Sequence, residues 1–278
     1  MKKYCIIVAG GSGRRMKSAI PKQFLLLEGR PLLMHTIERF SSFEPAMDII
    51  LVLPAEHHNL WKGLCREHSF SVTHKVVAGG EERFHSVSAG LEAVREIAFA
   101  ETGGAGAGTP PAGRRGAIEG VHVSGQGVAE ESVLPGGPAG TYDRPGQVTE
   151  DILIAIHDGV RPLVSHDTIW RCFADAEEFG TAVPFIEPAD SVRLLAGDDS
   201  RPVPRGEVRL IQTPQVFRGS VILNAYDRGY DPAFTDDATV AEASGVKIHL
   251  THGNRENIKI TTPEDLAVAQ TLAGMAGE

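Results

Sequence analysis

The chain has 278 residues, of which 42% are hydrophobic and 23% charged, and its formal net charge at pH 7 is -9. This composition is typical of a globular protein with enough apolar residues for a sizeable core. The acidic balance argues against a nucleic-acid partner, because proteins that bind nucleic acid usually carry a basic excess. A small phosphorylated substrate stays possible, since it needs only a local cationic pocket.

The cysteines and the apolar runs bear on where the protein works. Cys5, Cys65 and Cys172 are far apart and show no C-x-x-C spacing. We therefore expect reduced thiols in a cytoplasmic protein rather than a disulfide framework or a zinc site. The first apolar run is short and ends in glycines and arginines, unlike a signal peptide. No apolar stretch is long enough to cross a bilayer, so no membrane partner is expected.

Strands and helices alternate along most of the chain. Buried apolar runs predict strands, and apolar residues at three- and four-residue spacing predict helices. The expected strands are 4–9, 48–54, 75–78, 152–156, 182–185 and 246–251, and the expected helices are 31–40, 57–68, 86–98, 168–179 and 263–273. This alternation predicts an α/β fold with a mostly parallel sheet and helices on both faces.

Two segments depart from the alternation. Residues 101–150 contain 13 of the 31 glycines, many prolines and no sustained periodicity. We expect this segment to be a flexible inserted surface loop. Residues 191–211 are polar and rich in turns, and their flanking runs, 192–195 and 208–211, could pair as an arm that projects from the sheet. The sequence shows no internal repeat, so we expect residues 1–278 to form one domain with this insertion and this arm.

A glycine-rich loop follows the first predicted strand. Residues 8–16 are Val-Ala-Gly-Gly-Ser-Gly-Arg-Arg-Met, and residues 21–23 are Pro-Lys-Gln. A glycine turn between a buried strand and a helix exposes backbone N–H groups, and the helix N-terminus adds positive potential, so phosphates bind there. Two arginines and a lysine suit a triphosphate, because attack at its α-phosphorus develops charge on that phosphate and on the departing pyrophosphate.

The loop by itself leaves other interpretations open. A Walker loop needs Gly-Lys-Ser/Thr after four spacer residues, and the chain has no such sequence. A dinucleotide fingerprint that starts at Gly11 would need glycine or alanine where the chain has Met16, although the N-terminal placement fits. A surface helix start decorated with arginines is the third possibility. The loop alone therefore indicates phosphate binding without deciding among these.

Seven ordered motifs carry a resemblance to a known family. They are residues 8–16 with 21–24, 79–83 with 86–87, 157–162, 190–191, 212–215, 235–237 and 257–261. With these motifs the chain resembles the 2-C-methyl-D-erythritol 4-phosphate cytidylyltransferases nearly end to end, apart from residues 101–150. The resemblance implies a Rossmann-like nucleotidyltransferase fold. It also implies Mg²⁺-assisted transfer of a cytidylyl group from CTP to that polyol phosphate, with release of pyrophosphate, in non-mevalonate isoprenoid biosynthesis.

The resemblance also implies roles for individual residues. The catalytic residues are Arg15, Lys22, Arg205 and Lys259. The residues that bind CTP are Ala9, Gly10, Gly11, Gly13, Gly80, Glu81, Arg83 and Ser86. The residues that bind the polyol phosphate are Asp158, Arg161, Ser191, Thr213 and Thr235.

Asp158 is also the candidate Mg²⁺ ligand, and it follows a buried strand, where open α/β sheets bind ligands. The resemblance further implies a homodimer in which Arg205 arrives from the neighbouring subunit. The chain departs from the family pattern at Glu81, where aspartate is usual, at Ser191, where threonine is commoner, and at Pro204, where aspartate is frequent.

Several alternatives remain at the level of sequence. A ribitol-5-phosphate cytidylyltransferase would share almost the same motifs, and a nucleotide- or NAD(P)-binding regulatory protein is a more distant possibility. We interpret His157 as a structural residue at a strand end, since no second histidine lies at metal-ligand spacing. The pair Asp236 and Asp237 is expected to cap a helix rather than bind metal. Trp170 and Phe173 are expected in the core.

Overall fold

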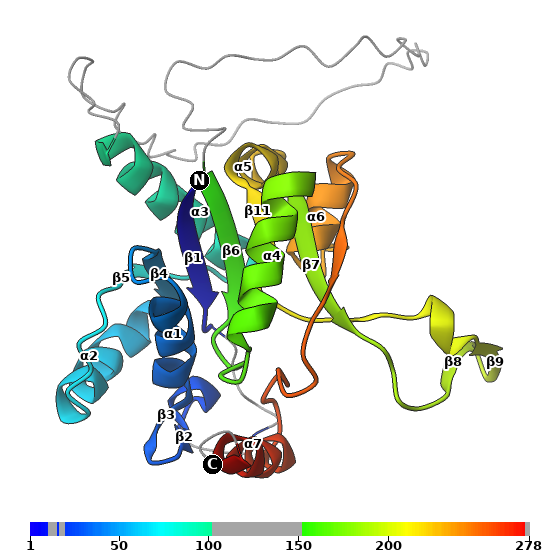
Figure 1. The fold of residues 1–278 in the computed structure, drawn as a ribbon, viewed down its shortest axis with the longest axis horizontal. Helices are drawn as coiled ribbons and strands as arrows, with labels where there is room; N and C mark the ends of the chain where they lie inside the picture. The colour runs from blue at the N-terminus through cyan, green and yellow to red at the C-terminus, as the bar shows by residue number, and fades with distance from the viewer. Residues whose placement is uncertain (11–15, 17–19, 102–151, 276–278) are drawn as a thin grey trace, which may run out of the picture.

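The computed structural model describes residues 1–10, 16, 20–101 and 152–275 (Figure 1). Within these residues, eight strands form one sheet in the order β10-β7-β11-β6-β1-β4-β5, with β12 also paired to β7. The strands are β1 (Lys2–Val8), β4 (Asp48–Leu53), β5 (Lys75–Ala78), β6 (Ile152–Asp158), β7 (Thr181–Ile186), β10 (Leu210–Ile211), β11 (Gln215–Arg218) and β12 (Leu250–His252).

Most neighbouring strands of the sheet are parallel. The strands β5, β4, β1 and β6 run parallel in turn, and β12 runs parallel to β7. The strands β10 and β11 are antiparallel to their neighbours, so β11 separates the two parallel groups. The predicted α/β fold with a mostly parallel sheet is confirmed.

Helices cover both faces of this sheet. They are α1 (Leu32–Phe43), α2 (His58–Glu67), α3 (Arg83–Glu101), α4 (His166–Phe179), α5 (Gly219–Tyr226), α6 (Asp237–Ala243) and α7 (Pro263–Met275). In Figure 1, α1 and α4 lie in front of the sheet and α3 lies behind it. No helix in the described ranges is both long and apolar enough to cross a membrane.

The alternation of side chains along β1 divides the core in two. Tyr4 and Ile6 belong to the cluster packed with α3, α5 and α6, whereas Cys5 and Ile7 belong to the cluster packed with α1, α2 and α4. All four are fully buried. Because successive side chains of a strand point to opposite faces, a run that is apolar at every position fits a strand covered on both sides.

The helix α4 shows why the sequence predicts element boundaries well where caps are present. The Ser165 side chain accepts a hydrogen bond from the backbone N–H of Thr168, which is a typical N-cap. Gly180 ends the helix with φ = 86°, a left-handed conformation that glycine adopts without steric cost. The other predicted elements also agree with the structure to within a few residues, except that the strand predicted at 246–251 begins only at Leu250.

The pairing predicted for the arm is wrong. The strand β8 (Val192–Ala196) pairs with β9 (Asp199–Val203) rather than with residues 208–211, and Leu210 pairs with β7. Gly197, with φ = 62°, opens a two-residue turn between β8 and β9, and such turns favour a local hairpin over a distant partner. The hairpin projects away from the sheet in Figure 1.

The expected burial of Trp170 is also wrong. Its side chain is 62% exposed, whereas Phe173 is buried as expected. The buried face of α4 is defined by Ile169, Cys172, Phe173 and Ala176, and Trp170 lies to one side of it. A spacing of three residues from a core position does not guarantee the core face, because each helical residue turns by about 100°.

The sequence did not predict β9, β11, α5 or the short hairpin of β2 (Leu26–Leu27) and β3 (Arg30–Pro31), and of α6 it predicted only the N-terminal cap. The predicted insertion at 101–150 lies outside the described residues except for its first residue, Glu101, which ends α3.

Candidate active site

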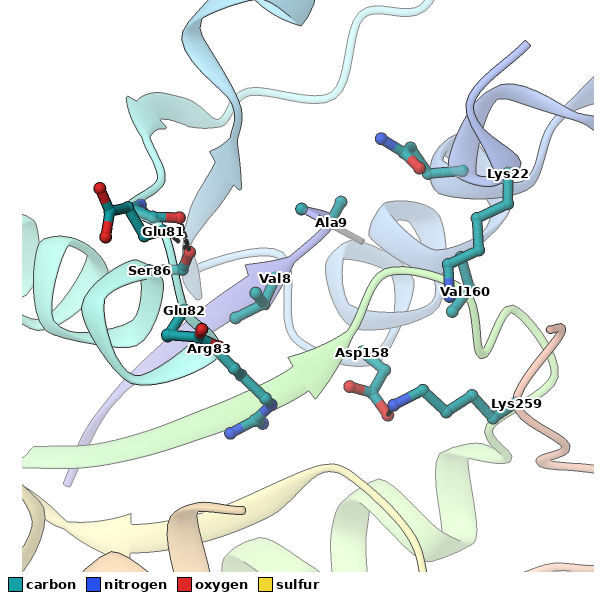
Figure 2. A pocket seen from close by; sticks show the side chains of 13 residues that line it. Val8, Ala9, Lys22, Glu81, Glu82, Arg83, Ser86, Asp158, Val160 and Lys259 are labelled. Atoms are coloured by element: carbon teal, nitrogen blue, oxygen red, sulfur yellow. Dashed lines mark hydrogen bonds and ion pairs between the residues drawn. The ribbon is translucent and has the colours of Figure 1, made fainter. Parts of the chain in front are cut away.

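A cavity of about 360 Å³ lies at the carboxyl ends of β1 and β6 (Figure 2). The parallel register places Val8 opposite Asp158, so the last residues of the two strands meet at this edge. The cavity is lined by Val8, Ala9, Gly10, Lys22, Gln23, Gly80, Glu81, Glu82, Arg83, Ser86, Asp158, Val160 and Lys259. This edge is where open α/β sheets bind their ligands.

The structure brings together most of the candidate residues predicted for CTP. Ala9, Gly10, Gly80, Glu81, Arg83 and Ser86 all line the cavity, as do the catalytic candidates Lys22 and Lys259. Arg15, Gly11 and Gly13, predicted as the remaining parts of the phosphate cradle, lie outside the described residues.

One wall of the cavity is the turn before α3. The backbone N–H of Gly80 donates to the Ser86 hydroxyl over 3.2 Å, and that hydroxyl lies 3.4 Å from the Gly80 carbonyl oxygen. A Cβ atom at Gly80 would overlap Cβ of His85. Only glycine therefore lets this turn fold onto the first turn of α3, which leaves backbone polar groups at the cavity surface.

Asp158 lies opposite this wall, at the end of β6. Its Oδ2 accepts from Nε of Arg161 over 3.0 Å and lies 3.1 Å from Nζ of Lys259. Burial alone would raise the pKa of this carboxyl, but Lys259, Arg83 and Arg161 outweigh burial and hold the pKa well below its usual range. Asp158 is therefore ionised and surrounded by positive charge.

His157 holds the end of β6 from within the core. Its Nε2 lies 3.1 Å from the carbonyl oxygen of Arg161 and must donate to it. The other nitrogen, Nδ1, then accepts from the Thr213 hydroxyl over 3.0 Å. Burial lowers the pKa of His157 to about 4, so the ring is neutral. Both ring nitrogens bind protein groups, as expected of a structural residue at a strand end.

Two candidates for polyol-phosphate binding are tied into this framework. The Thr213 hydroxyl also accepts from the backbone N–H of Asp158 over 3.1 Å, so it links the end of β6 to His157. Arg161 is 9% exposed, and its Nη1 donates to the carbonyl oxygen of Asn257 over 2.7 Å. Neither residue is among those that line the main cavity.

The remaining candidates lie further away. Thr235 lines a separate cavity of about 50 Å³ that also touches Arg83 and Tyr226. Ser191 and Arg205 belong to the projecting arm, where Nη1 of Arg205 donates to the carbonyl oxygen of Ala189 over 2.8 Å. Neither is among the residues that line the main cavity.

The acidic residues before α6 have structural partners. Asp236 caps α6 by accepting from the backbone N–H of Thr239, and Thr239 returns a bond to the backbone of Asp236. Asp237 is fully buried and binds Arg83. Across the described residues, no group of three or more His, Cys, Asp or Glu side chains could hold a metal ion. The expectation of a helix cap is confirmed for Asp236, whereas Asp237 is the first residue of the helix.

Two polar residues of the site, Gln23 and Asp237, were not predicted to belong to it. Gln23 is 1% exposed and lines the cavity, and neither atom of its amide has a hydrogen-bond partner in the described residues. Asp237 anchors a cavity residue from a distant helix. Gln23 could have been predicted, because it directly follows Lys22 in the motif at residues 21–24. No local sequence pattern indicated that Asp237 would bind Arg83.

Comparison with known proteins decides what kind of site this is. A sequence model of the 2-C-methyl-D-erythritol 4-phosphate cytidylyltransferase family matches residues 4–101 and 147–274. The chain belongs to this family. The match leaves out residues 102–146, most of the glycine-rich segment, and confirms the resemblance carried by the seven motifs. Members of this cytidylyltransferase family are nucleotidyltransferases, so the chain is an enzyme of that class.

Relatives across the cytidylyltransferase family cover nearly the whole chain. The protein of that name from Bacteroides thetaiotaomicron is 41% identical over 272 residues, which are 98% of this chain and 100% of the relative. The one from Clostridium botulinum is 31% identical over 273 residues, which are 96% of this chain and 97% of the relative.

Solved structures agree with the fold. The cytidylyltransferase from Thermus thermophilus has a TM-score of 0.64 at 25% identity and covers 99% of this chain and 100% of its own. The 4-diphosphocytidyl-2C-methyl-D-erythritol synthase from Anaerococcus prevotii has a TM-score of 0.68 over 98% of this chain and 96% of its own. At 23% identity, the second supports the fold alone.

Proposed function

We propose that this protein transfers a cytidylyl group from CTP to 2-C-methyl-D-erythritol 4-phosphate and releases pyrophosphate. The observation that carries the proposal is that Lys22, Arg83, Lys259 and Asp158 all line the same cavity, beside the start of the glycine loop. The names of relatives near 40% identity over the whole chain point to the same reaction.

CTP lies along the ends of β1 and β5 in this proposal. The triphosphate would bind at the glycine-rich sequence that begins at Gly10, because a glycine-rich turn between a strand and a helix offers backbone N–H groups to phosphates. The turn at Gly80, with Glu81, Arg83 and Ser86, receives the cytosine and the ribose. Backbone groups suit this task because they can bind the edge of a base at close range.

The chemistry needs no nucleophile from the protein. A phosphate oxygen of the polyol phosphate attacks the α-phosphorus of CTP in line, a new P–O bond forms, and the bond to the departing pyrophosphate breaks. Arg15 and Lys22 stabilise the charge that develops on the α-phosphate and on the pyrophosphate. Lys259 and Arg205 hold the attacking phosphate, with Arg161, Ser191, Thr213 and Thr235 around the polyol. Positioning and charge stabilisation therefore supply the catalysis.

The cofactor in this proposal is Mg²⁺, which Asp158 would hold together with the bound triphosphate. Mg²⁺ usually keeps several waters and binds few protein groups, so one ionised carboxylate at the cavity is a sufficient protein ligand. When bound, the cation neutralises phosphate charge during the transfer. The described ion pairs of Asp158 with Arg161 and Lys259 both use Oδ2, so Oδ1 would be the oxygen that binds the cation.

The proposed enzyme is a cytoplasmic homodimer. Arg205 is exposed on the arm and is absent from the lining of the cavity, which supports its contribution to a neighbouring subunit. The β8–β9 hairpin also exposes apolar side chains, with Leu195 at 85% and Leu194 at 46%, which a partner subunit would cover. The three cysteines are unpaired, as expected in a reducing compartment.

The deciding experiment measures pyrophosphate release by the purified protein with CTP, Mg²⁺ and one polyol phosphate at a time. We expect turnover with 2-C-methyl-D-erythritol 4-phosphate and little with ribitol 5-phosphate. Turnover with ribitol 5-phosphate alone would replace the proposed acceptor with the rival one. Absence of pyrophosphate with either acceptor, together with a rise in melting temperature caused by NAD(P), would favour a nucleotide-binding regulatory protein.

A further inference from the structure

We propose that Asp237 is a positioning residue, which together with Tyr226 fixes the guanidinium of Arg83 at the cavity wall in the orientation that receives CTP. This inference deepens the proposed function and rests on it, because CTP is the ligand that Arg83 is to meet.

The contact between Arg83 and Asp237 is a two-bond fork. Nη1 of Arg83 donates to Oδ1 of Asp237 over 2.7 Å, and Nη2 donates to Oδ2 over 2.6 Å. The Tyr226 hydroxyl donates to the same Oδ1 over 2.7 Å. Asp237 is 0% exposed, so its carboxylate has no access to solvent and is held by these three bonds. Paired geometry of this kind restricts the guanidinium to one plane.

Three helices hold this arrangement in place. Arg83 is the first residue of α3, Asp237 the first of α6 and Tyr226 the last of α5. The Tyr226 ring stacks on Phe84 at 4.6 Å with an interplanar angle of 14°. Asp237 lies 154 positions after Arg83 in the chain, so it is the tertiary fold that brings the two side chains together. A side chain held this firmly loses little entropy when a ligand binds.

The fork leaves part of Arg83 available to the cavity. A guanidinium has five N–H groups, and an end-on pair with a carboxylate uses two of them. Figure 2 shows the Arg83 side chain reaching from the wall of the turn towards Asp158. Burial disfavours the cation, but the Asp237 carboxylate more than compensates and raises the pKa of Arg83. The pair is thus close to neutral, and Arg83 serves CTP as a directional donor more than as a net charge.

Arg83 is proposed to act as a hydrogen-bond donor and Lys22 as a charge, so we expect their loss to affect different kinetic constants. A donor aimed at a part of CTP that does not react contributes equally to the ground state and the transition state. Loss of its orientation should therefore raise KM for CTP and leave kcat nearly unchanged. An ion pair that only stabilises the fold would move neither constant once the protein is folded.

The chain offers a matched control on the same helices. Nη2 of Arg95 on α3 binds both carboxylate oxygens of Asp227, the residue after α5, over 2.9 Å. This pair also joins α3 to the α5 region, but neither partner lines the main cavity. The Kd for CTP of Asp227→Asn therefore measures how much the loss of a purely structural ion pair affects CTP binding.

The test is calorimetric titration of the full-length protein with CTP and Mg²⁺ for the wild type, Asp237→Asn, Arg83→Gln, the double variant and Asp227→Asn. We expect Asp237→Asn to weaken the Kd for CTP about tenfold, since a charge-assisted pair is broken. In the Arg83→Gln background the same change should have no further effect. Asp227→Asn should bind like the wild type. Steady-state kinetics should show the change in KM with kcat within about threefold.

Each other outcome overturns the inference. Wild-type affinity in Asp237→Asn, or equal losses from that change with and without Arg83, would remove the positioning role. If Asp237→Asn does not fold, Tyr226→Phe keeps the ion pair and the ring stack and should weaken CTP binding about threefold only when Arg83 is present. Unchanged binding in that variant would also contradict the inference. Failure of the wild type itself to bind CTP would instead refute the proposed function, and the inference with it.

Discussion

At the residue scale, positive charge in and around the cavity is distributed between paired and less constrained side chains. Arg83 is locked to Asp237, and Arg161 is locked to Asp158 and to a backbone carbonyl. Lys259 contacts Asp158 but its side chain is 42% exposed. A lysine ammonium on a flexible stem can follow a moving charge, whereas a forked arginine fixes one geometry. The two kinds of cation therefore suit different steps of the proposed transfer.

Lys22 is a cation proposed to act on the transition state. Lys22→Ala should lower kcat by about 100-fold or more and weaken the Kd for CTP by less than about tenfold, because a charge aimed at the transition state acts mainly there. Single-turnover kinetics and calorimetry give the two values separately. Lys62→Ala, an exposed lysine on α2, is the control and should change neither. Equal losses in kcat and in affinity for Lys22→Ala would argue against the transition-state role.

Gln23 gives a prediction about stability. A buried amide that lacks hydrogen-bond partners costs about 1–3 kcal/mol, and Gln23 is in that situation within the described residues. Gln23→Met keeps the length of the side chain and removes the polar atoms. We expect it to raise the free energy of unfolding of the ligand-free protein by about 1 kcal/mol, measured by urea denaturation.

Gln215 is the control for that change, since it is equally buried at 1% exposure but fully bonded. Its Nε2 donates to Asp236 over 2.7 Å, and its Oε1 accepts from the backbone N–H of Ala238 over 2.8 Å. Gln215→Met should therefore destabilise the protein. Destabilisation of similar size in both variants would show that the Gln23 amide has hydrogen-bond partners in the folded protein.

His157 makes stability depend on pH in a defined window. Its pKa is about 4 in the folded protein, against an ordinary value of 6.5. Between these values the unfolded chain binds a proton that the folded chain does not, so stability falls as pH drops from about 6.5 to about 4. The loss should approach about 3 kcal/mol. The depressed pKa of Asp158 acts below this window, because its unfolded pKa is near 3.8.

Urea denaturation at several pH values, repeated with His157→Gln, isolates this contribution. The variant should show a shallower decline in stability between pH 6.5 and 4 than the wild type. Parallel pH profiles for the two proteins would mean that His157 is not the group that titrates.

The motifs predicted the composition of the site better than its internal contacts. Lys22, Arg83, Asp158 and Lys259 were expected to share one site, and the structure brings them to one cavity. Their pairing was not predictable, because the Arg83–Asp237 fork depends on how α6 packs against α3. A sequence pattern shows which residue types are present, whereas a hydrogen bond between distant helices depends on tertiary packing.

At the scale of elements, the packing of α3 on β1 depends on a helical glycine. A Cβ atom at Gly90 would lie 2.6 Å from Cγ2 of Ile6, which is fully buried. Gly90→Ala gains up to about 1 kcal/mol of helix propensity, but overpacking a rigid core costs about 1–3 kcal/mol. The branched Ile6 side chain cannot move aside easily, so we expect a net loss of stability.

Gly63 on α2 separates these two effects. No atom lies within 4 Å of its hypothetical Cβ, so Gly63→Ala should show the propensity gain alone, about 0.5–1 kcal/mol. Urea midpoints of the two variants and the wild type should therefore move in opposite directions. Stabilisation by Gly90→Ala would mean that α3 can shift away from the sheet at little cost.

Elements with clear periodicity and caps were predictable, and elements specified by tertiary contacts were not. The helix α4 has a serine N-cap and a glycine at its end, which the sequence displays directly. The strand β11 has four residues, all but one of them buried, and is too short for a periodic signal. The arm was predicted as a feature, but its predicted pairing was wrong, because the two-residue turn at Gly197 brings residues 199–203 beside 192–196 before the chain reaches 208–211.

At the scale of the whole molecule, one sheet connects the two larger of the three core clusters in the described residues, which supports the prediction of a single domain. The arm projects away from this sheet (Figure 1), and Arg205 lies on it. If Arg205 completes the site of a neighbouring subunit, two inactive variants should restore each other.

Mixing Arg205→Ala with Lys22→Ala tests this arrangement. In a mixed dimer, the site with an intact Lys22 receives an intact Arg205 from its partner. Random exchange at equal amounts should give complete sites in about a quarter of the total, since half of the dimers are mixed and each has one such site. Pyrophosphate release after exchange measures the recovery. No recovery, with exchange verified by mass spectrometry of the intact dimers, would place Arg205 in its own subunit's site or outside any site.

The cavity lies at the carboxyl ends of β1 and β6, whereas the borders of the glycine-rich segment lie at the opposite end of these two strands. Lys2 pairs in register with Ile152, and its ammonium binds Glu101, so both borders of residues 102–151 meet at the start of β1. Asp158 ends β6 six residues further on, about 20 Å away at the usual rise of a strand. Because the two borders are neighbours in space, the length of chain between them places no demand on the geometry at Asp158. This junction is therefore a point where the gene can gain or lose codons, in evolution or in the laboratory, without moving the residues that line the cavity.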